Sequence, residues 1–358
     1  MRYIYVVLIL FCLGKIYAQD SLSKKSVQAF PVPAIGKSIE TDWYFGAVCL
    51  FKFKNFFNTP QYSTAKLKLE YSLNKQFVVT TNWFIYTNQN KKIIIGDNAY
   101  LYFPEYYFGI GNNTAENNKL YYTAQRLELY NSLLWKIKPS VYLGVSVKAQ
   151  SISELEPEYT NTAISHELVN NNAGWSTGVG PHLLRDKRDR ILNPSAGSSF
   201  IEVENINYIK EKTTQNTNLF SSLKADIRYY HKLFAKSVIA WQYYSVHNFG
   251  NAPYRLLGLL GSDSHMRGYY QGRYRDNHYI AVQAEARIRI RDWLGFTLFT
   301  GVGDVYNNFS DANISNIKYT NGGGIRIRVD KDDNVNLRFD YGIGKETAGF
   351  YVAFGEAF

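Results

Sequence analysis

The chain has 358 residues and a mean hydropathy of −0.29. It contains no apolar run of about eighteen residues, so membrane-spanning helices are excluded. Its formal charge is +10, but the 40 lysines and arginines are spread along the chain instead of forming a stripe, which argues against a nucleic-acid partner.

Residues 1–18 are expected to form a secretory signal peptide. Arg2 supplies the positive start, residues 5–13 form an apolar run, and Ala18 is the small residue at a cleavage site before Gln19. An uncleaved anchor is the alternative, but the run is too short to span a bilayer. Cleavage removes Cys12 and leaves Cys49 alone, so no internal disulfide is predicted.

Residues 19–41 form a short polar lead before the predicted strands. Pro31 and Pro33 are expected to prevent a regular strand there, because proline lacks the N–H that a sheet needs. We therefore predict a short periplasmic lead, followed by one strand-rich domain over residues 42–358.

Period-2 alternation predicts about sixteen strands in this domain. The clearest is 278–291, where Ile280, Val282 and Ile288 fall on one face and Glu285 and Arg287 on the other. A transmembrane strand needs about 9–11 residues, with an apolar face toward lipid and a polar face toward the lumen. The predicted strands are 42–54, 63–74, 76–88, 91–103, 105–111, 120–137, 139–153, 174–186, 197–210, 218–231, 235–248, 278–291, 293–306, 318–329, 334–343 and 348–358.

The connections alternate in length. Long polar connections occur at 111–119, 154–173, 249–277 and 307–317, and short ones at 138–139, 232–233, 291–292 and 330–333. Outer-membrane barrels have long loops outside and short turns on the periplasmic side. The sequence thus predicts an all-β fold, a transmembrane antiparallel up-and-down β-barrel of about 16 strands. We expect it in the outer membrane of a Gram-negative bacterium, with both termini periplasmic.

The last strand ends on aromatic residues. Phe354 and the terminal Phe358 are expected to form a C-terminal insertion signal that the outer-membrane assembly machinery recognises.

Three segments together resemble the bacterial surface antigen barrel of the BamA/TamA superfamily of outer-membrane proteins. They are RDKRDRILNPSAG at 185–197, GSDSHMRGYYQGRYRDN at 261–277, and LRFDYGIG at 337–344 with the terminal Phe358. The first resembles the periplasmic turn of the family and the second its loop that folds back into the barrel. The matching residues are Arg188, Asp189, Asn193, Pro194 and Gly197 of the turn, and Arg267, Gly268 and Tyr269 of the loop tip.

This resemblance implies a lock inside the barrel. In the family, the loop arginine pairs with acidic residues on the two following strands, and Glu285 matches the first of these acids. The second belongs to a Phe-x-Asp-x-Gly pattern, but residues 299–303 read Phe-Thr-Gly-Val-Gly. The resemblance therefore implies one acid partner for Arg267 and a weaker lock than in full-length relatives. Assembly members also carry POTRA domains before the barrel, and the lead at 19–41 has no room for them, so we expect a barrel-only member.

A second candidate site is a lumen basic rim near the predicted periplasmic strand ends. Its members are Arg287, Arg289, Arg326, Arg328 and Arg338. They could bind an anionic ligand or peptide, or they could line a solvated wall and pair with nearby acids such as Glu285, Asp330 and Asp340.

Two functions remain open from the sequence. One is an accessory or translocation component that handles polypeptides or lipids, and the other is a passive, porin-like channel. The six histidines have no serine or aspartate at a known motif spacing, so we expect no enzyme, no metal and no cofactor. The expected partners are the lipid bilayer with lipopolysaccharide, the assembly machinery and other proteins of an outer-membrane complex, and no nucleic acid.

Overall fold

The structure is a computed structural model that describes the segments given at the end of this paragraph. The predicted signal peptide and the cleavage site before Gln19 lie outside the described residues. Among the described helical elements, none is long and apolar enough to cross a membrane. These elements are the short 3₁₀ turns η3 (Tyr254–Leu256), η4 (Phe309–Asp311) and η5 (Ile314–Asn316). The described residues are 26–38, 42–54, 59, 61–73, 75–116, 119–157, 173–211, 218–234, 236–331 and 334–358.

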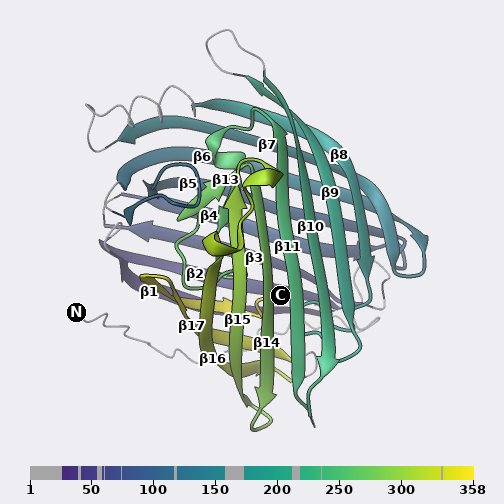
Figure 1. Ribbon diagram of the computed structural model, residues 1–358. Coiled ribbons are helices and arrows are strands. Elements are labelled where there is room, and N and C mark those ends of the chain that lie inside the picture. Colours follow the sequence, from purple (N-terminus) through teal and green to yellow (C-terminus); the bar gives the residue numbers. More distant parts are fainter. Residues whose placement is uncertain are drawn as a thin grey trace. The chain divides into compact units, whose positions relative to one another are not determined.

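Sixteen strands form one sheet in which the neighbours follow the chain order, β1 to β11 and then β14 to β18. The pairs whose register is given are all antiparallel, as an up-and-down order requires. Figure 1 shows β10, β11, β14 and β15 running side by side in this order. The strands are β1 (Ser26–Ser38), β2 (Asp42–Lys54), β3 (Ser63–Ser72), β4 (Phe77–Thr87), β5 (Lys92–Tyr107), β6 (Leu120–Lys138), β7 (Val141–Pro157), β8 (Gly174–Asp186), β9 (Ser199–Glu211), β10 (Asn218–Lys232), β11 (Val238–Gly250), β14 (His278–Arg289), β15 (Leu294–Tyr306), β16 (Lys318–Asp330), β17 (Val335–Gly344) and β18 (Thr347–Phe354).

The prediction that residues 19–41 contain no regular strand is wrong. Strand β1 spans Ser26–Ser38 and pairs along its whole length with β2, so Pro31 lies opposite Cys49 and Pro33 opposite Ala47. Strand β1 comes first in the sheet order and has β2 as its neighbour there. Proline is tolerated in a strand wherever no ladder hydrogen bond requires the missing N–H.

The division between the predicted strands 91–103 and 105–111 is also wrong, because β5 runs across it without a break and ends at Tyr107. The given pairing of β5 with β4 ends at Tyr102, opposite Phe77, so Pro104 removes no hydrogen bond from it. This error and the missed β1 offset each other, which is why the predicted number of strands agrees with the structure.

The chain divides into two compact units. The first contains residues 1–106, 120–182 and 206–218, and the second contains 107–119, 183–205 and 219–358. In the first unit, buried polar side chains pair with one another: Ser132 Oγ lies 2.6 Å from Ser146 Oγ, which lies 3.1 Å from His182 Nδ1. The second unit holds all the site residues predicted from the sequence.

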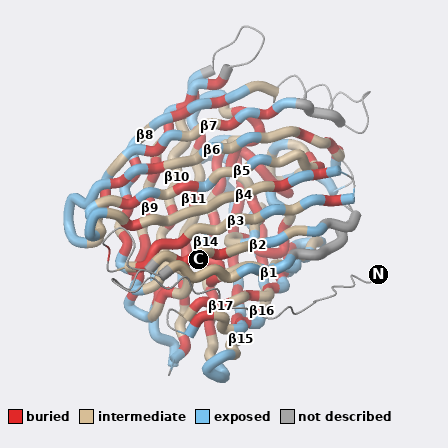
Figure 2. The backbone as a smooth tube through the Cα atoms, turned by 180° about the vertical axis from the view of Figure 1, so that it is seen from behind, coloured by how far each residue is buried: buried red, intermediate tan, exposed pale blue. Residues whose placement is uncertain are grey.

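Alternation along β14 agrees with the predicted faces. Val282 is 42% exposed, whereas Gln283, Glu285 and Arg287 are buried. Figure 2 shows buried and exposed residues alternating along the strands. Because the exposed positions are apolar and the buried ones are charged, the apolar face is the one that suits lipid.

Within the second unit, the connection between β11 and β14 packs against the charged face. It contains the short hairpin strands β12 (Gly258–Leu260) and β13 (Tyr274–Asp276), which pair with each other. Leu260, Met266 and Tyr269 from this connection are buried in one cluster with Tyr279 of β14 and Val305 of β15. The predicted loop therefore folds back onto the sheet and carries its tip, residues 266–269, with it.

Candidate functional site

Arg267, at the tip of the connection, is completely buried. Its Nη2 atom lies 2.5 Å from Glu285 Oε2 on β14, as the sequence predicted. Its Nη1 atom lies 2.5 Å from Asp340 Oδ2 on β17. The guanidinium carbon is 3.5 Å from the centre of the Phe299 ring on β15, a cation–π contact. Three strands therefore hold this one side chain.

The expectation of a single acid partner is wrong. The second acid is Asp340, which stands in Phe339-Asp340-Tyr341-Gly342 on β17, not on β15 where it was sought. On β15, the residue that faces the guanidinium is Phe299, which accepts the cation on its ring instead of with a carboxylate. The sequence did contain a signal for Asp340. It is followed two residues later by Gly342, and it lies in a segment where charged and apolar residues alternate.

Arg267 belongs to a larger buried network. Arg287 Nε lies 2.8 Å from Glu285 Oε1, and Arg326 Nη1 lies 2.5 Å from Asp340 Oδ1. Arg338 Nη1 donates to Asp340 Oδ2 at 3.0 Å. The side chains of these residues are at most 8% exposed. We call Arg267, Glu285, Arg287, Arg326, Arg338, Asp340 and Glu356 the arginine lock.

Glu356 was not predicted to belong here. The predicted last strand, 348–358, included it, but β18 ends at Phe354 and the Glu356 side chain is 2% exposed. Its carboxylate accepts hydrogen bonds at 2.6 Å from Arg326 Nε and from Asn336 Nδ2. Buried charges are stable only when they are paired and hydrogen-bonded, and the lock meets this condition with four arginines and three acids.

Glycine at position 268 lets the tip lie directly on β17. The φ of Gly268 is +110°, and an added Cβ would come within 2.7 Å of the Ile343 backbone nitrogen. The Gly268 N–H donates to the Tyr351 hydroxyl at 2.9 Å. Beside it, the Tyr269 hydroxyl donates to the Tyr319 carbonyl at 2.9 Å, and its ring lies against Gly344. Each predicted residue of the lumen loop lock therefore contacts the sheet.

The predicted periplasmic turn is built from its own hydrogen bonds. Asp189 Oδ1 accepts from the Ser195 N–H at 2.8 Å and from the Ser198 hydroxyl at 3.0 Å. Arg188 donates three hydrogen bonds to Asp186, two from its guanidinium at 2.8 and 2.9 Å and one from its backbone N–H at 3.0 Å, and its guanidinium lies 4.3 Å from the Phe200 ring centre. The turn residues are thus held by partners close in the sequence.

Two further contacts join this turn to other parts of the same unit. Asn193 Nδ2 donates to the Asn334 carbonyl at 2.8 Å, and the N–H of Gly197, whose φ is +87°, donates to the Tyr230 carbonyl at 2.7 Å. Pro194 lies between them and lines a pocket. The motif therefore fastens the β8–β9 connection to the β16–β17 connection and to β10.

Phe358 does not continue the last strand, in contrast to the predicted strand 348–358. It is 4% exposed and packs with Tyr230, Ala240 and Ala357. Its carbonyl oxygen accepts a hydrogen bond from Arg287 Nη2 at 2.6 Å. Phe354 is the last residue of β18. The two aromatic residues of the predicted insertion signal thus lie in different environments, and recognition by assembly machinery stays a prediction.

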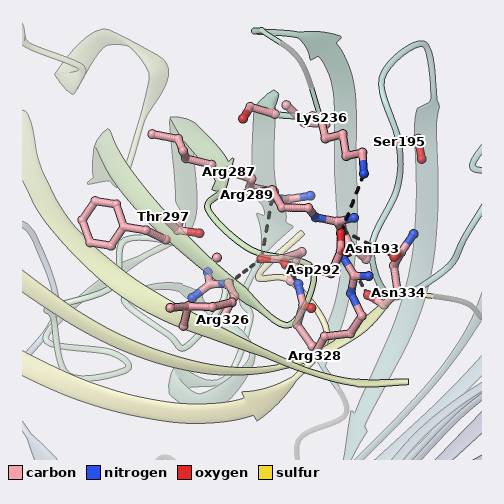
Figure 3. Close-up of a pocket in the computed structure, with 18 of the residues that line it drawn as sticks. Asn193, Ser195, Lys236, Arg287, Arg289, Asp292, Thr297, Arg326, Arg328 and Asn334 are labelled. Carbon is pink, nitrogen blue, oxygen red and sulfur yellow. Dashed lines mark hydrogen bonds and ion pairs between the residues drawn. The ribbon is translucent and has the colours of Figure 1, made fainter. Parts of the chain in front are cut away.

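The predicted lumen basic rim divides into two groups. Arg287, Arg326 and Arg338 are paired within the arginine lock, so they do not stand as a free rim. Arg289 and Arg328 form no ion pair within the described residues, and both line a pocket of about 330 Å³ among the turns. Figure 3 shows the pocket with its arginines and Asn193 and Asn334.

His265, which the sequence did not single out, stacks on Tyr244 at a ring-centre distance of 4.1 Å. Its Nδ1 atom lies 2.9 Å from Ser262 Oγ. Burial lowers the pKa of the His265 imidazole from 6.5 to about 4. The neighbouring charges act in both directions: Asp226 and Asp263 raise this pKa, and Arg228 and Lys224 lower it.

Lowering the pH is therefore expected to weaken the packing of the β11–β14 connection against the strands. Because the pKa of His265 is lower in the folded protein, this stability is present above pH 6.5 and is lost as the pH falls toward 4. His265→Phe keeps a ring on Tyr244. In this variant the free energy of unfolding is expected to depend less on pH in this range. Urea unfolding between pH 7 and 4 measures it, with exposed His231→Phe as the control. Equal slopes for both variants would contradict the assignment.

Comparisons with known proteins agree with this architecture. A family model described as the Omp85 superfamily domain matches residues 51–358. Among solved structures, BamA from Haemophilus ducreyi lacking POTRA domains 1–3 is similar at 14% identity and a TM-score of 0.54, over 92% of this chain and 70% of that chain. CdiB from Acinetobacter baumannii is similar at 10% identity and a TM-score of 0.52, over 92% of this chain.

The chain spans 60% of the length of CdiB. No curated protein sequence matches it. At these identities the likeness shows the fold alone, and it confirms the predicted class, a transmembrane antiparallel up-and-down β-barrel of about sixteen strands.

Proposed function

The chain belongs to the Omp85 superfamily, and from this premise we propose that it is an accessory or translocation component that handles polypeptides or lipids at the outer membrane. It is an integral outer-membrane barrel of the kind found in BamA and CdiB. The proposal gives it no catalytic role. Its partners would be the bilayer with lipopolysaccharide, the assembly machinery and proteins of an outer-membrane complex, with both termini on the periplasmic side.

The observation that carries the proposal is the locked connection between β11 and β14. A passive channel needs a free lumen, whereas here the tip residues Met266, Arg267 and Tyr269 are buried against the polar face of the strands. A buried arginine with two carboxylate partners keeps the tip there. This arrangement favours a barrel that is closed at rest over the alternative, a porin-like channel for small solutes.

Conductance separates the two functions. Purified chain in planar bilayers is expected to show no steady open current, because the connection occupies the polar face. Arg267→Ala is expected to produce open events, and Arg126→Ala to behave as the unmodified chain, since Arg126 pairs with Glu105 and Glu128 in the other unit. A steady current from the unmodified chain would favour the passive channel.

Cross-linking in cells tests the handling of polypeptides or lipids. A photoreactive amino acid at Phe350 of β18, which is 50% exposed, is expected to capture newly made outer-membrane chains, or lipid, transiently after a pulse label. The same probe at Val147 of β7, which is 52% exposed, serves as the matched control. Identical, time-independent products at both positions would contradict the proposal.

A further inference from the structure

The pocket near the turns has an excess of positive charge. Its lining contains seven basic residues and two acidic ones, Asp292 and Glu356. Glu356 already accepts from Arg326 and Asn336, and Asp292 lies 3.7 Å from Lys236 at an exposed position. Both acids also attract the charge of Arg289, but the lining still has five more basic residues than acidic ones.

Two of these arginines, Arg289 and Arg328, form no ion pair with the residues that the structure describes. Arg289 makes one long contact, 3.5 Å from Nη2 to Asn334 Oδ1, and the charge of Arg328 repels it. The Nε atom of Arg328 is buried and has no hydrogen-bond partner. Both side chains are half-buried and line the same cavity, where an anion would be a suitable partner for the two guanidinium groups.

The wall of the pocket offers a further donor. Arg287 is 7% exposed and lines the pocket, and its buried Nη1 atom has no hydrogen-bond partner, although its other nitrogen atoms bind Glu285 and Phe358. Figure 3 shows Arg287, Arg289 and Arg328 around the same cavity. Three arginines thus border one space, and two of them, Arg287 and Arg328, have a buried nitrogen without a hydrogen-bond partner among the described residues.

We propose that this pocket binds a phosphate group. Guanidinium groups are planar forks of donors that match phosphate oxygens, and a phosphate has enough oxygen atoms to accept from Arg287, Arg289 and Arg328 together. A volume of about 330 Å³ accommodates one such group with its substituent. The phosphate could belong to a lipid headgroup or to a soluble molecule, since both present the same chemistry.

Thermal unfolding of the full chain in a neutral detergent tests the proposal. Inorganic phosphate at constant ionic strength is expected to give a saturable rise in Tm over chloride. Phosphatidic acid in the micelle, compared with diacylglycerol, tests the lipid source. A response to phosphatidic acid alone assigns a lipid headgroup, and a response to inorganic phosphate supports a soluble ligand as well; either supports the proposal.

The variants distinguish a binding site from a structural role. Arg289→Gln with Arg328→Gln is expected to weaken phosphate binding by about tenfold or more, because two charge-assisted donors are lost. Without phosphate, this variant should melt no lower than the unmodified chain, since a repulsion has been removed. Lysine at both positions keeps the charge without the fork and should bind with intermediate strength.

The control removes two exposed positive charges from the same unit, Lys187→Gln with Lys331→Gln. It should respond to phosphate as the unmodified chain does. Loss of the response in this control would show a general charge effect and overturn the proposal. No response from the unmodified chain, or a response to a short acidic peptide but not to phosphate or phosphatidic acid, would also overturn it.

Discussion

Replacing Arg267 by alanine is expected to lower the free energy of unfolding by about 3–5 kcal/mol, the largest effect of any single substitution in the lock. The change leaves Glu285 and Asp340, both completely buried, without the cation that joins them. The Phe299 ring also loses its cation. Urea unfolding in detergent, followed by heat-dependent mobility in gels, measures the loss.

Two double-mutant cycles test which carboxylates interact with Arg267. Arg267→Ala combined with Glu285→Ala, and separately with Asp340→Ala, should each be less than additive, because either acid shares the same partner. Arg126→Ala is the control, since its carboxylate partners lie in a partly exposed place, where a pair contributes about 0–1 kcal/mol. Zero coupling in both cycles would show that the arginine lock does not stabilise the protein. Equal losses of unfolding free energy for Arg267→Ala and Arg126→Ala would show the same.

Gly268→Ala is expected to displace the loop tip from β17 while all charged groups of the lock remain present. An added Cβ would meet the backbone of Gly342 and Ile343 at 2.7–2.8 Å, and neither atom can move without breaking the pairing of β17. The φ of +110° adds strain for any residue with a side chain. We expect a loss of about 2–4 kcal/mol, from the strain and from the weakened contacts of Arg267 and Tyr269.

Limited proteolysis within residues 261–273 and the current in planar bilayers report this displacement. Gly323→Ala on β16 is the matched control, because the nearest atom to its added Cβ is 3.2 Å away and its φ is not in the left-handed region. Gly323→Ala should leave the loop protected. Gly268→Ala with unchanged protease resistance and no current would show that the tip does not depend on close approach to β17.

Much of the fold could be predicted from local pattern. Residues on a strand point to alternate faces, so the sequence of β14 already determined which side chains meet lipid and which meet the lumen. The cost of placing charge in lipid gave the orientation of those faces. Where prolines lay in a strand, as Pro31 and Pro33 do in β1, the outcome depended on whether a neighbouring strand needed the missing N–H. A single strand does not contain that information.

Part of the candidate site could also be predicted from local sequence. Arg267, Gly268, Tyr269 and Glu285 were identified because they match the loop tip and the first acid of the family that the sequence resembles. Asp340 is 73 residues from Arg267, and the β11–β14 connection and the order of β14 to β17 bring the two together. Which acid neutralises a buried cation depends on which strands surround it, so only the tertiary structure could decide it.

The pocket near the turns, likewise, could be predicted only in part from the sequence. The sequence determined that arginines would gather near these strand ends, because their positions alternate on one face of β14 and β16. It did not determine which of them would be paired: Glu356 turns inward and binds Arg326, while Arg289 and Arg328 keep no carboxylate within the described residues. Charge balance inside a protein is a property of the space that several segments enclose, and that space exists only after the chain has folded.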